Sequence, residues 1–158
     1  MNSIFKKFLL IIIFLVILPL VTEVQAASLN FDKSTATAAN GATFQISVTV
    51  DPGSDALNST DVYVTFDATL LKATAVSAGT MFPTVSNDIS TSGKVYIAGM
   101  VNDPASSVST TGTLATITFQ GLKEGTGTLS FDCNTSKIIK NDINASNVLP
   151  VHKMELRQ

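Results

Sequence analysis

The feature that most constrains this chain is an alternation of apolar and polar residues with a period of two. Phe44, Ile46 and Val48 alternate with Gln, Ser and Thr, and the same pattern returns along Asp61–Phe66. An extended strand points successive side chains to opposite faces, so this period predicts strands with one buried and one solvated face. No stretch of residues 27–158 shows a comparable helical period. The sequence therefore predicts an all-β protein.

Clusters of turn residues separate the predicted strands at short intervals, among them Asn40-Gly41, Ser92-Gly93 and Asn102-Asp103-Pro104. Glycine, asparagine, aspartate and proline favour the backbone conformations that turns require. The strands are expected at Ser28–Asp32, Ala42–Val50, Asp61–Phe66, Leu71–Ser77, Ser86–Ser90, Lys94–Val101, Thr113–Gln120, Gly127–Phe131 and Val148–Leu156. Nine strands at this spacing indicate two packed sheets, which is a β-sandwich.

One face of each strand supplies the predicted core. The inward residues are Phe44, Ile46, Val48, Val50, Val62, Val64, Phe66, Val95, Ile97, Ala115, Ile117, Phe119, Leu129 and Phe131. The residues between them are largely Thr, Ser, Gln or Lys. This pattern is typical of a sheet that has one face on the core and the other in water.

Residues 1–26 have the layout of a secretory signal peptide. Two lysines precede a 14-residue apolar run, Phe8–Val21, and the segment ends on a small residue, Ala26. The alternative is an uncleaved membrane anchor, but the run is shorter than the roughly 20 residues that span a bilayer. We therefore expect cleavage after Ala26. The product, residues 27–158, would be a single secreted or cell-surface domain without membrane attachment.

Charge and cysteine content restrict which partners residues 27–158 can bind and how they can be stabilised. Eight basic and eleven acidic residues give this part of the chain a formal net charge of −3, without a basic patch. Nucleic acid and anionic lipid are therefore unfavourable partners. Cys133 is the only cysteine, so stability must come from a packed core and not from internal disulfides. We expect Cys133 to be buried or half-buried, with an intermolecular disulfide as the less favoured alternative.

The residues needed for catalysis or metal binding are scarce. His152 is the only histidine, and Glu124 and Glu155 are the only glutamates after residue 26. Zinc sites and paired-carboxylate hydrolases need clusters that this composition does not supply. The segment Asp51–Asp55 lacks the spacing and the terminal glutamate of an EF-hand calcium loop. The sequence therefore predicts a binding module that is not an enzyme and that uses no metal and no cofactor.

Four segments carry, in order, a resemblance to a known family. They read GATFQISVTVDP, DVYVTFDATLLKATAVSAGTMF, SGKVYIAGMVND and TGTLATITFQGLKEGTGTLSFD. Their landmarks include a strand that opens on glycine, a strand that closes on an aromatic–Asp corner, and an Ala-x-Ile-x-Phe strand before a glycine-rich turn. This ordered set spans nearly all of residues 28–156 and resembles the cohesin domains of bacterial cellulosomal and cell-surface scaffold proteins.

The resemblance implies a nine-stranded β-sandwich of jelly-roll topology that holds dockerins, the small calcium-loaded modules of polysaccharide-degrading enzymes. The calcium would then belong to the partner. It also implies that the partner lies across one flat sheet face, which includes the strand before the aromatic–Asp corner and Lys94–Val101. Asp61 stands where such cohesins often carry an acidic partner-facing residue, and Ser59 where they often carry asparagine. Asn102 stands where some of them carry an acid.

Strand parity places two tyrosines on the same outward side as this acid. Asp61, Tyr63 and Thr65 alternate with core residues, and Tyr96 has the outward parity in Lys94–Val101. Tyrosine is favoured at interfaces because it combines contact area with a polar tip. The predicted protein-binding residues are therefore Asp61, Tyr63, Thr65, Tyr96 and Asn102. The alternative is that both tyrosines merely cover the surface of the sheet.

Two further functions are compatible with this fold. Carbohydrate-binding modules share the jelly-roll sandwich, but their flat binding faces usually carry rows of aromatic residues, and this chain has two tyrosines and no tryptophan. A structural or adhesion domain without a defined small partner is the third interpretation. The favoured one is a secreted module that captures a dockerin-like protein in extracellular assemblies linked to polysaccharide breakdown.

Cleavage of the signal peptide can be checked on the exported protein. Mass spectrometry should find Ala27 at the mature N-terminus, because the segment before it has the three-part layout that signal peptidase recognises. A mature protein that still contains Lys6 would show that residues 1–26 act as an anchor.

Overall fold

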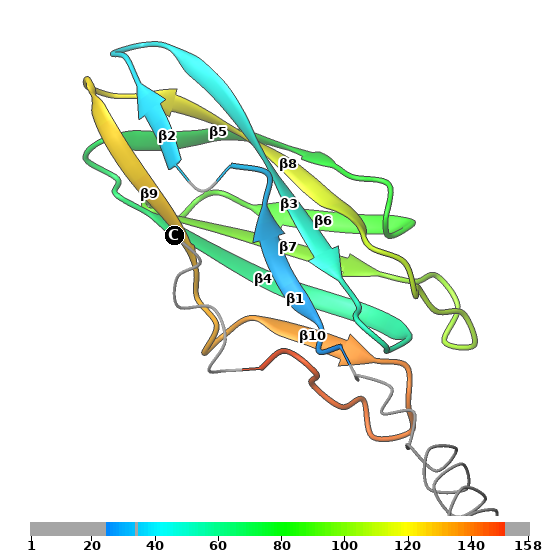
Figure 1. Cartoon of the computed structure of the whole chain (residues 1–158). Coiled ribbons are helices and arrows are strands. Elements are labelled where there is room, and N and C mark those ends of the chain that lie inside the picture. The colour runs from blue at the N-terminus through cyan, green and yellow to red at the C-terminus, as the bar shows by residue number, and fades with distance from the viewer. Residues whose placement is uncertain (1–24, 34, 151–158) are drawn as a thin grey trace, which may run out of the picture.

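A computed structural model describes residues 25–33 and 35–150, and all of the regular structure in them is β (Figure 1). The strands are β1 (Ser28–Phe31), β2 (Thr35–Ala38), β3 (Thr43–Asp51), β4 (Leu57–Phe66), β5 (Leu71–Ala78), β6 (Thr84–Asp88), β7 (Lys94–Met100), β8 (Gly112–Gly121), β9 (Gly125–Phe131) and β10 (Lys137–Lys140). They form two sheets of antiparallel strands, packed face to face. The predicted all-β sandwich is confirmed.

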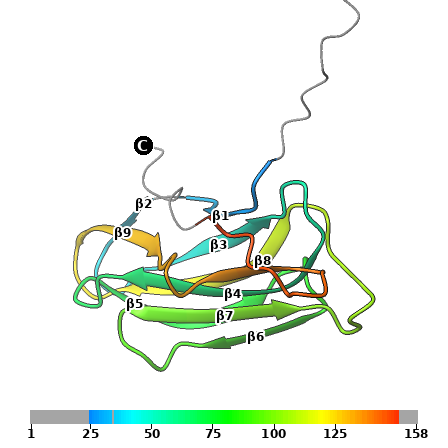
Figure 2. The ribbon, with the colours of Figure 1, turned by 90° about the horizontal axis from the view of Figure 1, so that it is seen from below.

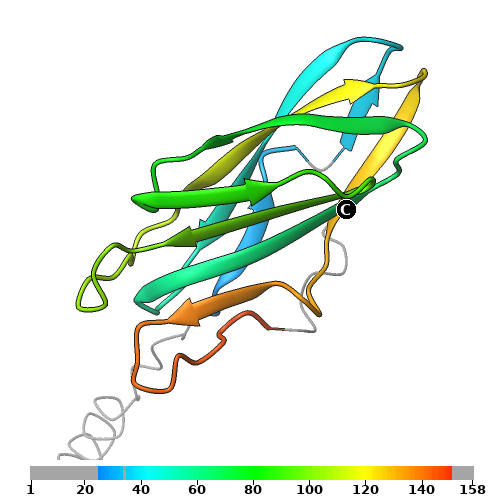
Figure 3. The same cartoon turned by 180° about the vertical axis from the view of Figure 1, so that it is seen from behind.

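The two sheets have different sizes. The smaller has the order β1-β3-β8-β5, and the six-stranded sheet has the order β2-β9-β4-β7-β6, with β10 added beside β4. β9 and β10 pair with β4 one after the other, β9 at residues 64–66 and β10 at residues 57–61. Figure 3 shows β10 in orange alongside β4, and Figure 2 shows β6 next to β7 at the margin of the sheet. This order leaves one broad face on β10, β4, β7 and β6.

The N-terminal segment gives one strand to each sheet, and only the first of the two, β1, was predicted. β1 pairs with β3 in the four-stranded sheet, whereas β2 pairs with β9 in the six-stranded sheet. Asp32 ends β1 by accepting the amide hydrogen of Ser47 on its carboxylate, at 2.8 Å. The chain then passes to the other sheet before Thr35. When β1 and β2 are counted as two halves of one strand, the sandwich has nine strands, the predicted number, but β10 replaces the strand predicted at Val148–Leu156.

The end of the domain departs furthest from the prediction. The described part of the strand expected at Val148–Leu156, residues 148–150, forms no strand, and only an isolated bridge between Asn147 and Ile139 precedes it. The side-chain oxygen of Asn147 accepts the N–H groups of Ile138 and Leu149, so these donors are not free to build a longer ladder. The rest of that segment lies outside the described residues. β10, which was not predicted, forms the pairing instead.

β6 begins and ends earlier than the predicted strand Ser86–Ser90. It runs over Thr84–Asp88, and the carboxylate of Asp88 then accepts the amide hydrogen of Ser90 at 2.8 Å. Aspartate bonded to the backbone two residues on turns the chain. This local bond ends the strand two residues before the predicted position.

The core between the sheets contains the predicted inward residues. Ile46, Val48, Val50, Val62, Val64, Val95, Ile97, Ala115, Ile117 and Phe119 are each 0% exposed. Phe119 stacks against Phe44 at 5.6 Å between ring centroids and meets Phe66 edge-on at 5.1 Å. Aromatic pairs prefer such offset and T-shaped arrangements. The predicted parity is therefore confirmed, with Phe44, Phe66 and Phe131 half-buried at the border of the core.

Two remaining predictions concern membranes and the cysteine. The predicted signal peptide lies almost entirely outside the described residues, so its cleavage stays a prediction. Within the described part of the chain, no helix has the length and apolar character needed to span a membrane. Cys133 is half-buried, as predicted, and its thiol donates to the carbonyl oxygen of Phe131 at 3.6 Å.

A cavity in the core should be costly. Ile117→Ala removes a fully buried side chain from the centre of β8 and should lower the free energy of unfolding by about 2–5 kcal/mol. Ser77→Ala, an exposed change on the neighbouring strand, should alter it by less than about 0.5 kcal/mol. Urea unfolding measures both values. Equal stability of the two variants would contradict the packing described for β8.

Candidate protein-binding face

Four of the five predicted site residues lie on one surface. We call this surface the outer face and define it by the outward-pointing side chains of β10, β4, β7 and β6. In the ladder between β4 and β7 the opposed pairs are Tyr63–Tyr96, Asp61–Ala98 and Thr65–Lys94. The residues between them, such as Val62, Val64 and Val95, are fully buried. The alternation seen in the sequence therefore decides which side chains reach this surface.

The two tyrosines and the aspartate form a connected group. The rings of Tyr63 and Tyr96 lie 4.9 Å apart between centroids, tilted by 33°. The Tyr96 hydroxyl donates a hydrogen bond of 2.6 Å to Oδ1 of Asp61. Asp61 is the diagonal neighbour of Tyr96, and the small side chain of Ala98 between them leaves room for this contact. The structure thus places Asp61, Tyr63 and Tyr96 together.

The hydrogen bond to Asp61 changes the acidity of Tyr96. Together with partial burial and the nearby negative charge, it raises the pKa of Tyr96 from about 10 to about 12. A phenolate at this position would lose the hydrogen bond and face the carboxylate directly. Tyr96 therefore acts as a neutral donor to Asp61 throughout the physiological pH range.

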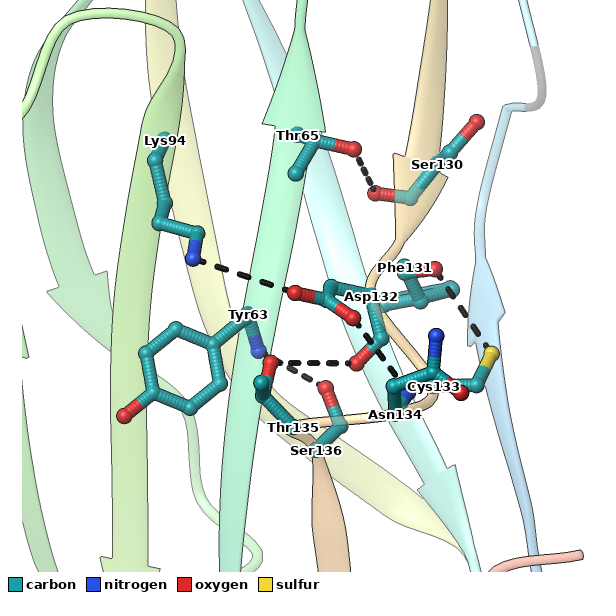
Figure 4. A network of polar contacts seen from close by, with 10 residues as sticks. All are labelled: Tyr63, Thr65, Lys94, Ser130, Phe131, Asp132, Cys133, Asn134, Thr135 and Ser136. Carbon is teal, nitrogen blue, oxygen red and sulfur yellow. Dashed lines mark hydrogen bonds and ion pairs between the residues drawn. The ribbon is translucent and has the colours of Figure 1, made fainter. Parts of the chain in front are cut away.

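Lys94 also contacts the ring of Tyr63. Its Nζ lies 4.9 Å from the centre of this ring and 3.8 Å from Oδ2 of Asp132. Figure 4 shows the ion pair with Asp132. A lysine over an aromatic face is attracted by the electron density of the ring. The Tyr63 ring thus contacts both Tyr96 and a lysine that is paired with Asp132.

The turn between β9 and β10 completes the backbone pairing of Tyr63 (Figure 4). The amide hydrogen of Tyr63 goes to the hydroxyl of Ser136 at 3.0 Å, and its carbonyl accepts the amide hydrogen of Asp132 at 2.8 Å. Ser136 is 1% exposed. Side-chain and backbone groups of this turn therefore replace the strand partner that β4 lacks at this position.

Thr65 and Asn102 lie at two ends of the group. Thr65 donates from its hydroxyl to the carbonyl oxygen of Ser130 on β9 at 3.2 Å. Asn102 follows the end of β7, is exposed, and accepts a 2.6 Å hydrogen bond from the hydroxyl of Thr84 on β6. Asn102 is therefore a border residue, separate from the pair of tyrosines.

Sequence reasoning missed the apolar end of the outer face. Register places Ile139 opposite Ser59, and Ser59 opposite Met100, so two apolar side chains flank a small one. Met100 is 49% exposed. Met100 lies four residues after Tyr96 on the same strand, so strand alternation alone predicts that it points outward. Ile139 and its neighbour on this face, Lys137, had no such signal because β10 was not predicted.

The chemistry of the outer face suits recognition. Among the described residues there is no cluster of three or more His, Cys, Asp or Glu side chains that could hold a metal ion. The face offers aromatic area, a carboxylate whose Oδ2 accepts no hydrogen bond within the described chain, and lysines. Groups of this kind can bind and orient another molecule. The fold and this surface together define a β-sandwich binding module.

Comparison with known proteins assigns the family. The cohesin domain profile matches residues 28–149, so this chain belongs to the cohesin family and the resemblance seen in the sequence is confirmed. Cohesins are binding modules and not enzymes, in agreement with the predicted function class. No curated protein matches the sequence significantly.

Solved structures of cohesins share the fold. The sixth cohesin of scaffoldin B from Acetivibrio cellulolyticus, in complex with the Cel5 dockerin, matches with a TM-score of 0.61 at 18% identity, covering 76% of this chain and 92% of that one. The type II cohesin–X-dockerin complex of the same organism gives 0.60 at 16% identity, covering 80% and 92%. The cohesin module of a family 33 glycoside hydrolase from Clostridium perfringens gives 0.60 at 12% identity, covering 80% and 90%. These similarities confirm the jelly-roll fold.

The acidity of Tyr96 can be measured directly. In a Tyr63→Phe variant Tyr96 is the only tyrosine, so the ultraviolet absorbance of tyrosinate reports this residue alone. The midpoint should lie at about 12, and adding Asp61→Asn should move it down towards 10. Because the folded pKa is raised, the hydrogen bond stabilises the fold fully below pH 10, and this contribution is lost as the pH rises through about 12. Circular dichroism checks folding at each pH, and equal midpoints in both variants would contradict the contact.

Proposed function

We propose that this chain is a dockerin-binding cohesin whose partner lies across the outer face. The observation that carries the proposal is the joint position of Asp61, Tyr63 and Tyr96 on one sheet surface, where Tyr96 donates a hydrogen bond to Asp61 and contacts the ring of Tyr63. Membership of the cohesin family supports it. Two of the similar solved structures are themselves complexes with dockerins.

The central group has the features of an interface anchor. Tyrosine supplies contact area at a low cost in conformational entropy, and anchors of this kind dominate binding energy. Asp61 accepts the Tyr96 hydroxyl on Oδ1, which leaves Oδ2 for an N–H or O–H donor of the partner. Because Lys94 and Tyr96 hold the Tyr63 ring in place, little side-chain freedom is lost on binding.

The contact must extend beyond β4 and β7. A stable interface of standard size buries about 800 Å² on each partner. Two short strands do not present that area, so the neighbouring strands β6 and β10 must share the contact. Both lie on the outer face, with Ser86 and Thr84 on one side and Lys137 and Ile139 on the other. In this arrangement Asn102 would lie at the border of the contact.

The proposal includes a setting outside the cell. The signal-peptide pattern of residues 1–26 supports export, and dockerins of polysaccharide-degrading enzymes would be the natural partners there. The likeness to a cohesin module of a glycoside hydrolase is in keeping with this setting. Calcium would be needed by the dockerin and not by this chain.

Direct carbohydrate binding is less well supported by the geometry. Lys94 lies over the Tyr63 ring, and the two tyrosine rings are tilted by 33°, so they do not form one flat aromatic platform. Incubation with insoluble cellulose and chitin tests this alternative. Retention of the chain on either polysaccharide, lost in Tyr63→Ala, would favour it over protein binding.

Binding can be tested with recombinant dockerins in calcium and in a chelator. Titration calorimetry against a panel of calcium-loaded dockerins should find at least one partner, with binding lost on calcium removal. For that partner, Tyr63→Ala should weaken binding by about 2 kcal/mol or more, and Asn102→Ala by less than about 1 kcal/mol. Asp61→Ala should also weaken it, because the carboxylate is removed from the centre of the contact.

A control variant separates the outer face from the rest of the surface. Gln45→Ala changes an exposed side chain on the four-stranded sheet and should bind like the unmodified chain. All variants should remain folded, since their side chains point away from the core, and only Asp61→Ala, which removes the hydrogen bond from Tyr96, and Tyr63→Ala, which removes the ring contacts, should lower the melting temperature slightly. If Asp61→Ala and Tyr63→Ala bind normally while Gln45→Ala does not, the site lies on the opposite sheet.

A further inference from the structure

The loop that follows β10 presents an apolar side chain in an unusual way. Ile143 is 100% exposed, the most exposed large apolar residue of the described chain. A single exposed apolar residue needs no explanation by itself. Ile143, however, lines a groove of about 470 Å³ together with three other apolar residues, Ile139, Pro104 and Ala145, and four polar ones, Asn58, Lys140, Asn141 and Asp142. We call the four apolar residues, Ile143 included, the loop patch.

The loop holds Ile143 in a defined position. Oδ1 of Asp142 accepts the amide hydrogens of Asn144 at 3.1 Å and Ser146 at 3.0 Å. The carbonyl of Ser146 in turn accepts the amide hydrogen of Lys140 at 2.9 Å. Ala145 adopts a left-handed backbone, with φ at 48°, which is uncommon for a residue with a side chain. The bonds within the loop therefore define the backbone from which Ile143 projects into solvent.

Contacts to neighbouring loops fix the base of this segment. The amide hydrogen of Asn141 goes to the carbonyl of Ala56 at 2.8 Å, and its side-chain nitrogen donates to the carbonyl of Ser106 at 3.0 Å. Lys140 forms an ion pair of 2.7 Å with Asp55. The loop is thus tied to the segments before β4 and after β7. An apolar residue on such a preorganised support binds without the cost of ordering the loop.

The loop patch continues the outer face. Ile139 belongs to both surfaces, since it lies opposite Ser59 on the outer face and also lines the groove. A partner that covers Tyr63, Tyr96 and Met100 reaches Ile139 next, and the groove lies directly beyond it. The area that a standard interface needs also exceeds that of the central strands. Because the two surfaces share Ile139, and because a standard interface needs more area than the central strands offer, we expect one partner to cover both the outer face and the loop patch.

We propose that the partner of the outer face also contacts the loop patch, where Ile143 is a specificity-determining anchor. The inference rests on the proposed function. The partner is a dockerin whose surface carries an apolar pocket for Ile143 and an apolar side chain that enters the groove beside Ile139. Dockerins that place a charged or polar group directly against the Ile143 side chain are disfavoured, because that group would be buried without a hydrogen-bond partner.

The test uses the dockerin that binds most tightly in the panel described above. Ile143→Ser should weaken binding by about tenfold or more, since a central apolar anchor is lost. Leu122→Ser is the matched control: Leu122 is 43% exposed, and the turn between β8 and β9 that carries it lies at the opposite end of the sandwich (Figure 1). This control should bind like the unmodified chain.

Hydrogen exchange of the unbound chain tests the rigid support without a partner. The amide hydrogens of Asn141, Asn144 and Ser146 should exchange at least about tenfold more slowly than in an unstructured peptide, and Asp142→Ala should release the last two. Exchange at the unstructured rate in the unmodified chain would overturn the inference.

The outcomes separate the two proposals. Loss of binding in Tyr63→Ala with normal binding in Ile143→Ser would overturn the loop anchor and leave the proposed function intact. Equal weakening in Ile143→Ser and Leu122→Ser would also overturn it, because the effect would then follow surface hydrophobicity in general. Failure of every dockerin to bind would overturn the proposed function and, with it, this inference.

Discussion

The structure depends on how the backbone of β4 is hydrogen-bonded along both of its edges. One edge pairs continuously with β7, but the other is shared by β9 and β10, which leave a gap at Tyr63. Unpaired backbone groups are costly in a buried strand. The hydroxyl of Ser136 and the amide of Asp132 fill that gap. Two consecutive strands can therefore extend one edge of β4, which widens the outer face to include β10.

The same turn links backbone order to side-chain order. Asp132 bonds the backbone of Tyr63 and also positions Lys94 over the Tyr63 ring, while Tyr96 supports the ring from the other strand. The positions of the two tyrosine rings on the outer face therefore depend on how the strands of the sheet are paired. A change in the β9–β10 turn would disturb the proposed site without touching the residues that contact a partner.

Much of this arrangement could be predicted from local pattern. Alternation along β4 and β7 decides which side chains face outward, so Asp61, Tyr63 and Tyr96 were recognised together. β10 was not recognised because Ile138 and Ile139 are adjacent apolar residues, one buried and one outward, and show no alternation. The Tyr96–Asp61 hydrogen bond and the exposed Ile143 depend on register and loop contacts between distant segments. No local pattern encodes them.

The division of the first strand between two sheets also limits the order in which the domain can fold. β1 pairs with β3, which follows soon after it, whereas β2 pairs with β9 near the end of the domain. Distant segments pair late because closing a long loop costs conformational entropy. A chain that emerges N-terminus first therefore keeps β2 without its partner until Phe131 has emerged. Only then are the two sheets joined through their shared first strand.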